Sequence, residues 1–258
     1  MCRWLAYQGE PIYLETLIYQ PEFSLIQQSL SARKGATRVN ADGFGIGWYS
    51  NRSTPGVFHE VMPAWSDDNL RSLAHHLSSH RFMAHVRAST GTQVSRANCH
   101  PFVVNQWMFI HNGQIGDYER LRYSLERHLS EKWYQYRTGT TDSELIFLLM
   151  LQNGLQNDPV LAIEKTLETI LKMIEDKQIS SPFKASMCLS DGEQIWIVRY
   201  SSDGHAPTVF WQQDGQNVVF SSEPLCSQGK WRLINEHCIM QVKQDRVTST
   251  PLTVRLTH

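Results

Sequence analysis

The sequence has few of the features that mark membrane, secreted or nucleic-acid-binding proteins. Apolar residues never run for about 18 positions or more, so no ordinary transmembrane helix is expected. Residues 1–10 lack the basic and then apolar sections of a signal peptide. The formal net charge is −1, which gives no overall attraction for nucleic acid or for an anionic membrane. A cytoplasmic protein is therefore expected.

Cysteine is scarce and scattered. The five cysteines form an odd set without a CxxC pair, which argues against a disulfide framework or a cysteine zinc site and favours a reducing compartment. Phosphate-binding loops of the GxxxxGK[ST] or GxGxxG type are also lacking. The histidine group His75, His76, His80 and His85 has no acidic or cysteine partner at metal-ligand spacing. The sequence therefore predicts neither a metal nor a cofactor.

No internal repeat, low-complexity tract or Pro/Gly/Ser linker divides the chain, so residues 1–258 are expected to form one domain. Short apolar or alternating runs predict strands, with a weaker signal near the end of the chain. Asp-Gly pairs at 191–192 and 214–215 predict tight hairpin turns. The predicted strands are residues 3–7, 43–49, 57–62, 82–86, 108–111, 185–190, 195–200, 208–212, 218–221 and 238–242.

Longer amphipathic segments predict helices at residues 67–77, 117–129, 142–151 and 159–174. Asp158 is a suitable N-cap for the last of these, because a proline follows at the first helical position. Strands come early, helices lie in the middle and hairpins follow. This order indicates an α+β fold with antiparallel sheets rather than alternating βαβ units.

Cys2 is the first candidate for chemistry. A cysteine directly after the initiator methionine is small enough to permit methionine removal, which would leave a thiol and a free α-amine on one residue. The reference pKa of an α-amine is about 7.7–8.0, so this amine can act as the general base for its own thiol. Thiolate attack on an amide carbonyl would give a thioester. A cysteine near the start of a chain carries little information by itself.

Two later positions have suitable donors but also structural interpretations. Arg87 follows the strand predicted at 82–86, and a guanidinium forms a bidentate pair with a carboxylate. Thr90 adds a hydroxyl nearby, although an ordinary ion pair would also explain the arginine. Asn112 and Gly113 end another apolar run, where an amide and a main-chain N–H can form an oxyanion hole. Asn-Gly is equally a hairpin-turn signal.

Asp142 precedes the apolar helix predicted at 142–151. Its carboxylate is suited to a substrate α-ammonium group, but aspartate is also common at helix starts because it stabilises the helix dipole. Both interpretations remain open from this residue alone.

Taken in order, Cys2, Arg87, Asn112-Gly113 and Asp142 resemble the glutaminase domain of class II glutamine amidotransferases, a branch of the N-terminal nucleophile hydrolases. The local frames match as well: His-x-Arg at 85–87, His-Asn-Gly at 111–113 and Thr-Asp-Ser-Glu at 141–144. The fold that this resemblance implies is a four-layer αββα sandwich with two stacked antiparallel sheets.

The resemblance also implies a role for each matching residue. Cys2 would be the nucleophile and its freed amine the general base. Asn112 and Gly113 would stabilise the oxyanion, Arg87 and Thr90 would hold the substrate α-carboxylate, and Asp142 would hold the α-ammonium. The resemblance implies no cofactor.

Nearly the whole chain resembles one branch of stand-alone proteins within the family. The segments are residues 1–7, 40–48, 98–102 and 221–225. This branch includes the ergothioneine-pathway γ-glutamyl hydrolase and the amidotransferase-like subunit of fungal glutathione-degrading complexes. The resemblance therefore implies that the protein hydrolyses the γ-glutamyl amide bond of a small molecule as its own reaction.

Further residues of these segments could line the pocket. Asp42 and His100 are candidates, with structural hydrogen bonding as the alternative, and Ser222 and Glu223 could frame the γ-glutamyl site. The basic residues Arg33, Lys34 and Arg38 could meet an acidic substrate tail or simply form a solvated loop.

Two other functions remain compatible with the sequence. The protein could be a glutaminase subunit that delivers ammonia to a separate synthase. It could instead be a catalytically silent γ-glutamyl-binding module in which Met1 is retained and blocks the amine. By analogy alone, a peptidase or synthase partner or a homo-oligomer is possible.

Overall fold

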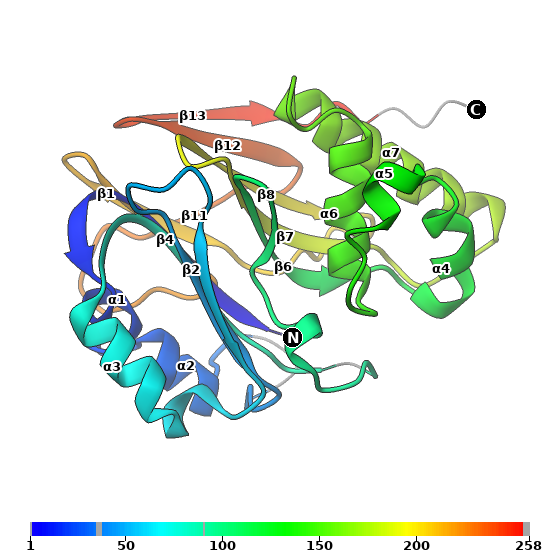
Figure 1. Cartoon of the computed structure of the whole chain (residues 1–258). Helices are drawn as coiled ribbons and strands as arrows, with labels where there is room; N and C mark the ends of the chain where they lie inside the picture. The colour runs from blue at the N-terminus through cyan, green and yellow to red at the C-terminus, as the bar shows by residue number, and fades with distance from the viewer. Residues whose placement is uncertain (1, 35–37, 90, 255–258) are drawn as a thin grey trace.

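The computed structural model describes residues 2–34, 38–89 and 91–254, which form two antiparallel sheets packed face to face (Figure 1). The seven-stranded sheet has the order β11-β9-β10-β1-β4-β2-β3. Its strands are β1 (Arg3–Tyr13), β2 (Phe44–Trp48), β3 (Gly56–Glu60), β4 (Ser78–Val86), β9 (Phe210–Asp214), β10 (Asn217–Ser221) and β11 (Arg232–Leu233).

The six-stranded sheet has the order β13-β12-β8-β7-β6-β5. Its strands are β5 (Phe102–Val104), β6 (Trp107–Gln114), β7 (Lys184–Ser190), β8 (Gln194–Ser201), β12 (Cys238–Lys243) and β13 (Arg246–Pro251).

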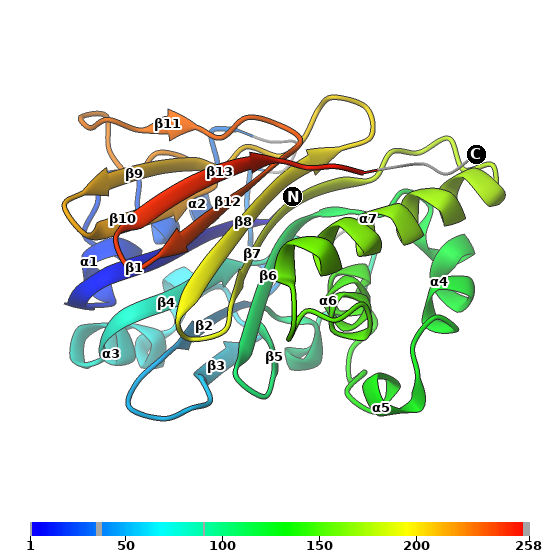
Figure 2. The ribbon, with the colours of Figure 1, turned by 90° about the horizontal axis from the view of Figure 1, so that it is seen from above.

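Helices cover the outer face of each sheet, so the layers run α, β, β, α (Figures 1 and 2). The seven-stranded sheet carries α1 (Glu15–Ile18), α2 (Leu25–Leu30) and α3 (Asp68–His76), and the six-stranded sheet carries α4 (Tyr118–Glu126), α5 (Glu131–Tyr134), α6 (Asp142–Gln152) and α7 (Pro159–Asp176). The short 3-10 turns η1 (Ala64–Ser66) and η2 (Arg96–Asn98) lie in connecting segments. The predicted α+β fold with two stacked antiparallel sheets is confirmed.

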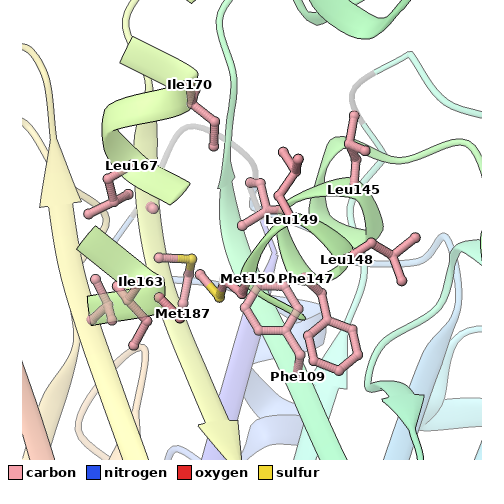
Figure 3. Packing of buried hydrophobic residues seen from close by; sticks show 14 of the residues in the cluster. Phe109, Leu145, Phe147, Leu148, Leu149, Met150, Ile163, Leu167, Ile170 and Met187 are labelled. Carbon is pink, nitrogen blue, oxygen red and sulfur yellow. The ribbon is translucent and has the colours of Figure 1, made fainter. Parts of the chain in front are cut away.

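Three apolar clusters separate the four layers. The cluster between the sheets takes Trp4 and Met83 from one sheet and Met108 and Ile197 from the other. The cluster under α4 to α7 contains α6, whose side chains are buried at every position from 143 to 151. There the rings of Phe109 and Phe147 stack with centroids 5.3 Å apart (Figure 3). Burial on all sides explains why α6 is apolar around its whole circumference.

The predicted elements are found, most with small shifts at their ends, although β1 continues past the predicted residue 7 to Tyr13 and β4 begins at Ser78 instead of residue 82. All four predicted helices are present, as α3, α4, α6 and α7. Both predicted hairpins are present, with Gly192 (φ 93°) between β7 and β8 and Gly215 (φ 58°) between β9 and β10. Among the described helices, none is long and apolar enough to cross a membrane.

The beginning of β1, the end of β4, the end of β6 and the beginning of α6 meet at one edge of the sandwich. Arg3 on β1 pairs with Val86 on β4. The main-chain N–H of Ile115, just after β6, donates to the carboxylate of Asp142 on α6 at 2.8 Å. Four segments that are distant in sequence thus bring polar side chains to one place.

Candidate active site

Cys2 lies at the start of β1, against the residue that follows Arg87. Its Sγ accepts a hydrogen bond from the Ala88 N–H at 3.4 Å and lies 3.6 Å from the Ala88 carbonyl oxygen. Burial raises the pKa of the Cys2 thiol, although the Ala88 N–H and the positive charges of Arg87 and Arg3 act in the opposite direction. A thiol in this position is protonated near neutral pH, so its use as a nucleophile requires a base.

The Arg87 guanidinium is buried but bonded only to uncharged oxygens. Its Nη2 donates to the Thr92 hydroxyl at 2.6 Å, and more weakly to Ser89 Oγ and the Gln93 carbonyl at 3.3 Å. Its Nη1 donates to the Asp42 main-chain carbonyl at 3.3 Å. Within residues 2–34, 38–89 and 91–254, no carboxylate lies within ion-pair distance of Arg87. A buried cation without a counter-ion is costly, so this position is suited to an anionic ligand group.

Asp42 holds the loop that follows Arg87. Its carboxylate accepts from the Ser89 N–H at 2.7 Å, and its main-chain N–H donates to the Arg87 carbonyl at 3.0 Å. Asp42 is not among the residues that line the Cys2 cavity. Thr90, the second residue expected to hold an α-carboxylate, lies outside the described residues.

Asn112 and Gly113 lie within a strand and not in a hairpin turn. They pair with Ser186 and Ala185 of β7 in regular antiparallel register, so the interpretation of Asn-Gly as a turn is wrong. Gly113 has φ 154°, and a Cβ there would overlap the main-chain carbonyl of Lys184. Among the described residues, no partner hydrogen-bonds the buried Asn112 side-chain oxygen. The unpartnered atom is the amide oxygen, whereas an oxyanion would be bound by the amide N–H.

Asp142 begins α6, but Thr141 caps the helix. Thr141 Oγ1 accepts from the Glu144 N–H at 3.2 Å. The Asp142 carboxylate instead accepts from the Ile115 N–H at 2.8 Å and from the Ser143 hydroxyl at 3.2 Å. It is half-buried and faces the cavity, so its negative charge is available to a cationic group.

Three imidazoles surround this site. Nδ1 of His111 lies 2.9 Å from the Ser143 hydroxyl, and burial lowers the pKa of His111 although Asp142 opposes the shift. His85 and His100 are both buried and pack with ring centroids 4.1 Å apart. Burial lowers the pKa of His85 to about 3 and that of His100 well below its usual range. These three rings are neutral near neutral pH.

One narrow cavity brings together five of the predicted site residues, but Asn112 does not line it. Its walls include Cys2, Arg87, His100, Gly113 and Asp142. The thiol, the guanidinium and the carboxylate therefore face one space, as an amino-acid ligand with an electrophilic side chain would require. The neighbouring cavity of about 380 Å³, toward Tyr118 and Arg120, shares Thr92, Gln114 and Asp142 with it.

Ser222 and Glu223 lie beside the nucleophile segment but do not line the Cys2 cavity. Ser222 Oγ accepts from the Trp4 N–H at 3.0 Å. The buried Glu223 carboxylate accepts from Arg3 Nε at 2.8 Å and from the main-chain N–H of Lys34 at 2.8 Å. Both residues thus position the chain on either side of the site.

Sequence reasoning did not identify Thr92, Gln114 and Ser143 as lining residues. Thr92 follows Arg87 by five positions, and Ser143 lies within the matched Thr-Asp-Ser-Glu frame, so proximity to a motif was the available signal. Among the described residues, no group of three or more His, Cys, Asp or Glu is placed to hold a metal ion.

Comparison with known proteins identifies similar sequences over almost the whole chain. A family model described as class-II glutamine amidotransferases matches residues 15–206. Saccharomyces cerevisiae DUG3, named as a probable glutamine amidotransferase, is 28% identical over 98% of this chain and 84% of its own length. The γ-glutamyl-hercynylcysteine sulfoxide hydrolase of Mycolicibacterium smegmatis is 26% identical over 98% of this chain and 100% of its own.

Solved structures are similar as well. A glutamine aminotransferase class-II domain protein from Silicibacter pomeroyi superposes with a TM-score of 0.76 at 32% identity, covering 97% of this chain and 99% of the other. The glutamine phosphoribosylpyrophosphate amidotransferase of Bacillus subtilis gives a TM-score of 0.68 at 14% identity. That match covers 98% of this chain and 50% of the other, and it bears on the fold alone.

Proposed function

Because the chain belongs to the class-II glutamine amidotransferases, we propose that it hydrolyses a γ-glutamyl amide bond through a thioester on Cys2 and releases glutamate. This membership of the family confirms the resemblance that the sequence motifs indicated. The observation that carries the proposal is the cavity in which the Cys2 thiol, the Arg87 guanidinium and the Asp142 carboxylate face one another.

The first half of the proposed reaction forms the thioester. Removal of Met1 frees the Cys2 α-amine, which takes the proton from the thiol as Sγ attacks the γ-carbonyl carbon. The negative charge that develops on the carbonyl oxygen is stabilised by the Asn112 amide and the Gly113 N–H. The C–N bond then breaks, and the proton on the α-amine passes to the departing amine. A base is needed because burial raises the pKa of the Cys2 thiol.

The second half hydrolyses the thioester. A water molecule gives a proton to the same α-amine as its oxygen attacks the thioester carbon. The C–S bond breaks, the sulfur regains the proton, and glutamate leaves. The α-amine gives the first proton to the departing amine and the second to the sulfur. Both the α-amine and the thiol of the enzyme therefore end in their starting states.

The charges of the cavity support a glutamyl group as the ligand. The Arg87 guanidinium is buried among neutral oxygens, so a substrate α-carboxylate supplies the missing counter-ion. Asp142 is fixed by the Ile115 N–H and offers a carboxylate to the α-ammonium. Opposite charges at two points of one cavity match the two ends of an amino-acid head group.

A second candidate is a glutaminase whose ammonia is used by a partner synthase. Its support is that two of the similar proteins, DUG3 and the Silicibacter pomeroyi protein, are named for glutamine amidotransfer or aminotransfer. In that case glutamine would be the preferred γ-glutamyl compound.

Glutamate release tests these proposals. The processed protein is incubated with glutamine, with γ-glutamyl dipeptides and with a γ-glutamyl thioether sulfoxide. Cys2→Ala should abolish release from every compound and keep the wild-type circular dichroism spectrum. Cys238→Ala, which removes a thiol from β12, serves as the matched control and should retain activity. Turnover by Cys2→Ala, or no turnover by processed wild-type protein, would contradict the hydrolase; the latter would favour a silent binding module.

A further inference from the structure

The two charged residues proposed to bind the glutamyl head group come from different halves of the sandwich. Arg87 follows β4 of the seven-stranded sheet, whereas Asp142 begins α6, which packs on the six-stranded sheet (Figure 1). The α-carboxylate and the α-ammonium of a glutamyl group are attached to the same carbon atom. The guanidinium and the carboxylate must therefore keep a fixed separation, because a displacement of about 1 Å can cost roughly 100-fold in rate.

The buried side chain of Asn98 connects the two halves. Its amide nitrogen, Nδ2, donates to the main-chain carbonyl of Gln93 at 2.8 Å, in the segment that follows Arg87. Its amide oxygen, Oδ1, accepts from the main-chain N–H of Thr140 at 2.8 Å, two residues before Asp142. One amide group thus hydrogen-bonds both segments, and only an asparagine or glutamine side chain offers a donor and an acceptor in this arrangement.

We propose that Asn98 is a positioning residue that sets the separation between Arg87 and Asp142, and that it thereby selects substrates with both a free α-carboxylate and a free α-ammonium. The inference rests on the proposed binding of a γ-glutamyl group in the Cys2 cavity. Among the residues that the structure describes, Asn98 is not in the wall of that cavity. Asn98 therefore acts through its neighbours and does not touch the substrate.

On one side, the link to Arg87 passes through a shared carbonyl. The Gln93 carbonyl accepts from Arg87 Nη2 at 3.3 Å as well as from Asn98. Gln93 is exposed, so burial of its own side chain does not fix this carbonyl. Asn98 donates the shorter of the two bonds and thus holds an oxygen that the guanidinium contacts.

On the other side, the link to Asp142 depends on a close approach of two main chains. A Cβ on Gly139 would lie 2.5 Å from the Ala97 carbonyl oxygen and 2.5 Å from Asn98 Oδ1. Glycine at this position therefore lets the segment that leads into α6 lie directly against Asn98. A second bond, from Asn98 Nδ2 to Thr140 Oγ1 at 3.1 Å, holds the same segment.

The segment that carries Asn98 is anchored at the edges of both sheets. Arg96 forms an ion pair with Glu60, the last residue of β3, at 2.5 Å. The buried Cys99 Sγ lies 3.6 Å from the Glu60 carbonyl oxygen, and β5 begins soon after, at Phe102. Because β3 and β5 are edge strands of different sheets, the position of Asn98 is defined by both halves of the sandwich.

The test compares ligands that differ only in the α-ammonium. Each γ-glutamyl compound is paired with its glutaryl analogue, such as glutamine with glutaramate and γ-glutamyl-glycine with glutaryl-glycine. The analogue competes for the site whether or not it is hydrolysed, and it releases no glutamate. The selectivity is the ratio of the inhibition constant of the analogue to the KM of the γ-glutamyl compound. In wild-type protein this ratio should be roughly 10 to 100, the effect of one charge-assisted contact.

Asn98→Ala should lower this ratio at least about fivefold. Both ligands keep a carboxylate for Arg87, but only the γ-glutamyl compound also uses Asp142, so only its binding depends on the separation of the two charges. Asn98→Asp keeps an acceptor for the Thr140 N–H but has no donor for the Gln93 carbonyl. It should therefore lower the ratio as well.

Two further variants separate positioning from general stability. Gly139→Ala leaves Asn98 unchanged but pushes the two segments apart, so it should also lower the ratio. Asn153→Ala is the matched control, because it removes a side-chain hydrogen bond to Thr166 at the far end of α6. It should lower the melting temperature and leave the ratio unchanged.

The outcomes distinguish this inference from the proposed function. A wild-type ratio in Asn98→Ala or Asn98→Asp, or an equal fall in Asn153→Ala, would overturn the inference and leave the hydrolase intact. If the Asn98 variants do not fold, Gly139→Ala decides in the same way. A ratio near 1 in wild-type protein would also overturn the inference, because Asn98 would then have no second charge to position. No glutamate release from any compound would overturn the proposed function and the inference together.

Discussion

At the scale of single residues, Arg87 is the position most clearly adapted to a ligand. Arg81 on β4, the strand that Arg87 follows, is also buried, but it donates to main-chain carbonyls of the β7–β8 turn, at Gly192 and Glu193, and to Gln8. Arg87 instead lines the cavity and lies among hydroxyls and carbonyls that leave its charge uncompensated. The two arginines thus have a structural and a binding environment, respectively.

We expect Arg87→Lys to raise KM for glutamine by roughly 10- to 100-fold with a smaller effect on kcat, because an ammonium cannot form the bidentate pair of a guanidinium. Arg81→Lys is the matched control and should lower the melting temperature without a comparable change in KM. Steady-state kinetics and thermal unfolding of both variants provide the measurement. Equal KM values for Arg87→Lys and wild type would contradict the assignment.

Buried neutral histidines predict a loss of stability in acid. The pKa of His85 is about 3 in the folded state, against an ordinary value of 6.5, and that of His100 is lowered in the same direction. Below pH 6.5 the unfolded chain therefore binds protons that the folded chain refuses. The stability present above pH 6.5 is lost as the pH falls toward 3.

The urea midpoint should accordingly be lower at about pH 5 than at about pH 7.5. His85→Gln removes one of the titrating rings and should show a smaller difference between the two conditions. A wild-type midpoint that rises on acidification, or an unchanged pH effect in the variant, would argue against the burial of a neutral ring.

Local sequence patterns alone could not assign these residues. Asn112-Gly113 is a strong turn signal, yet it lies in β6 because its pairing with β7 depends on residues about 70 positions away. Asp142 at a helix start suggested capping, but Thr141 has that role. Only the ordered combination of motifs favoured a site, and the structure brings Cys2, Arg87, Gly113 and Asp142 around one cavity.

At the scale of elements, the connection before α6 determines where Asp142 lies. The buried Glu144 carboxylate accepts from the main-chain N–H groups of Thr138, at 2.9 Å, and Gly139, at 2.8 Å. It also pairs with Arg137 at 2.8 Å. One residue of α6 thus fixes the loop that leads into the helix and the ligand-facing Asp142.

Glu144→Gln should lower the free energy of unfolding by about 3–5 kcal/mol, because it removes the nearer and more buried of the two carboxylates that pair with Arg137, at 2.8 Å against 3.5 Å for Glu126. It should also raise KM for glutamine, since the start of α6 is less well fixed. Glu126→Gln, which affects more exposed ion pairs with Arg122 and Arg137, should cost less than about 1 kcal/mol. Urea unfolding and kinetics of both variants would decide, and equal losses would contradict this role for Glu144.

The sequence predicted elements well where periodicity had room to appear. The amphipathic helices α3, α4 and α7 and the Asp-Gly hairpins were expected from their patterns. The unpredicted elements are the short ones, α1, α2, α5, β5 and β11, whose two to six residues span too little chain for a period to be recognised. The lysine segment at 33–34 was equally ambiguous, because its anchor is Glu223, about 190 residues away.

At the scale of the whole molecule, the two sheets share one core. Trp4 and Phe220 of one sheet and Met108 and Met240 of the other lie in the same apolar cluster. Separating the sheets would expose this cluster, so we propose that the chain is a single domain that unfolds as one unit. Tryptophan fluorescence and far-ultraviolet circular dichroism should give coincident urea transitions. Two resolved transitions would contradict a single domain.

The proposed thioester on Cys2 is tested most directly by locating the acyl group on the chain. The processed protein is mixed with a γ-glutamyl substrate, quenched in acid during turnover and analysed by intact mass and peptide mapping. We expect a chain that begins at Cys2 and carries a γ-glutamyl group on that residue, with no such adduct in Cys2→Ala. An adduct on another residue, or full turnover by a chain that retains Met1, would contradict it.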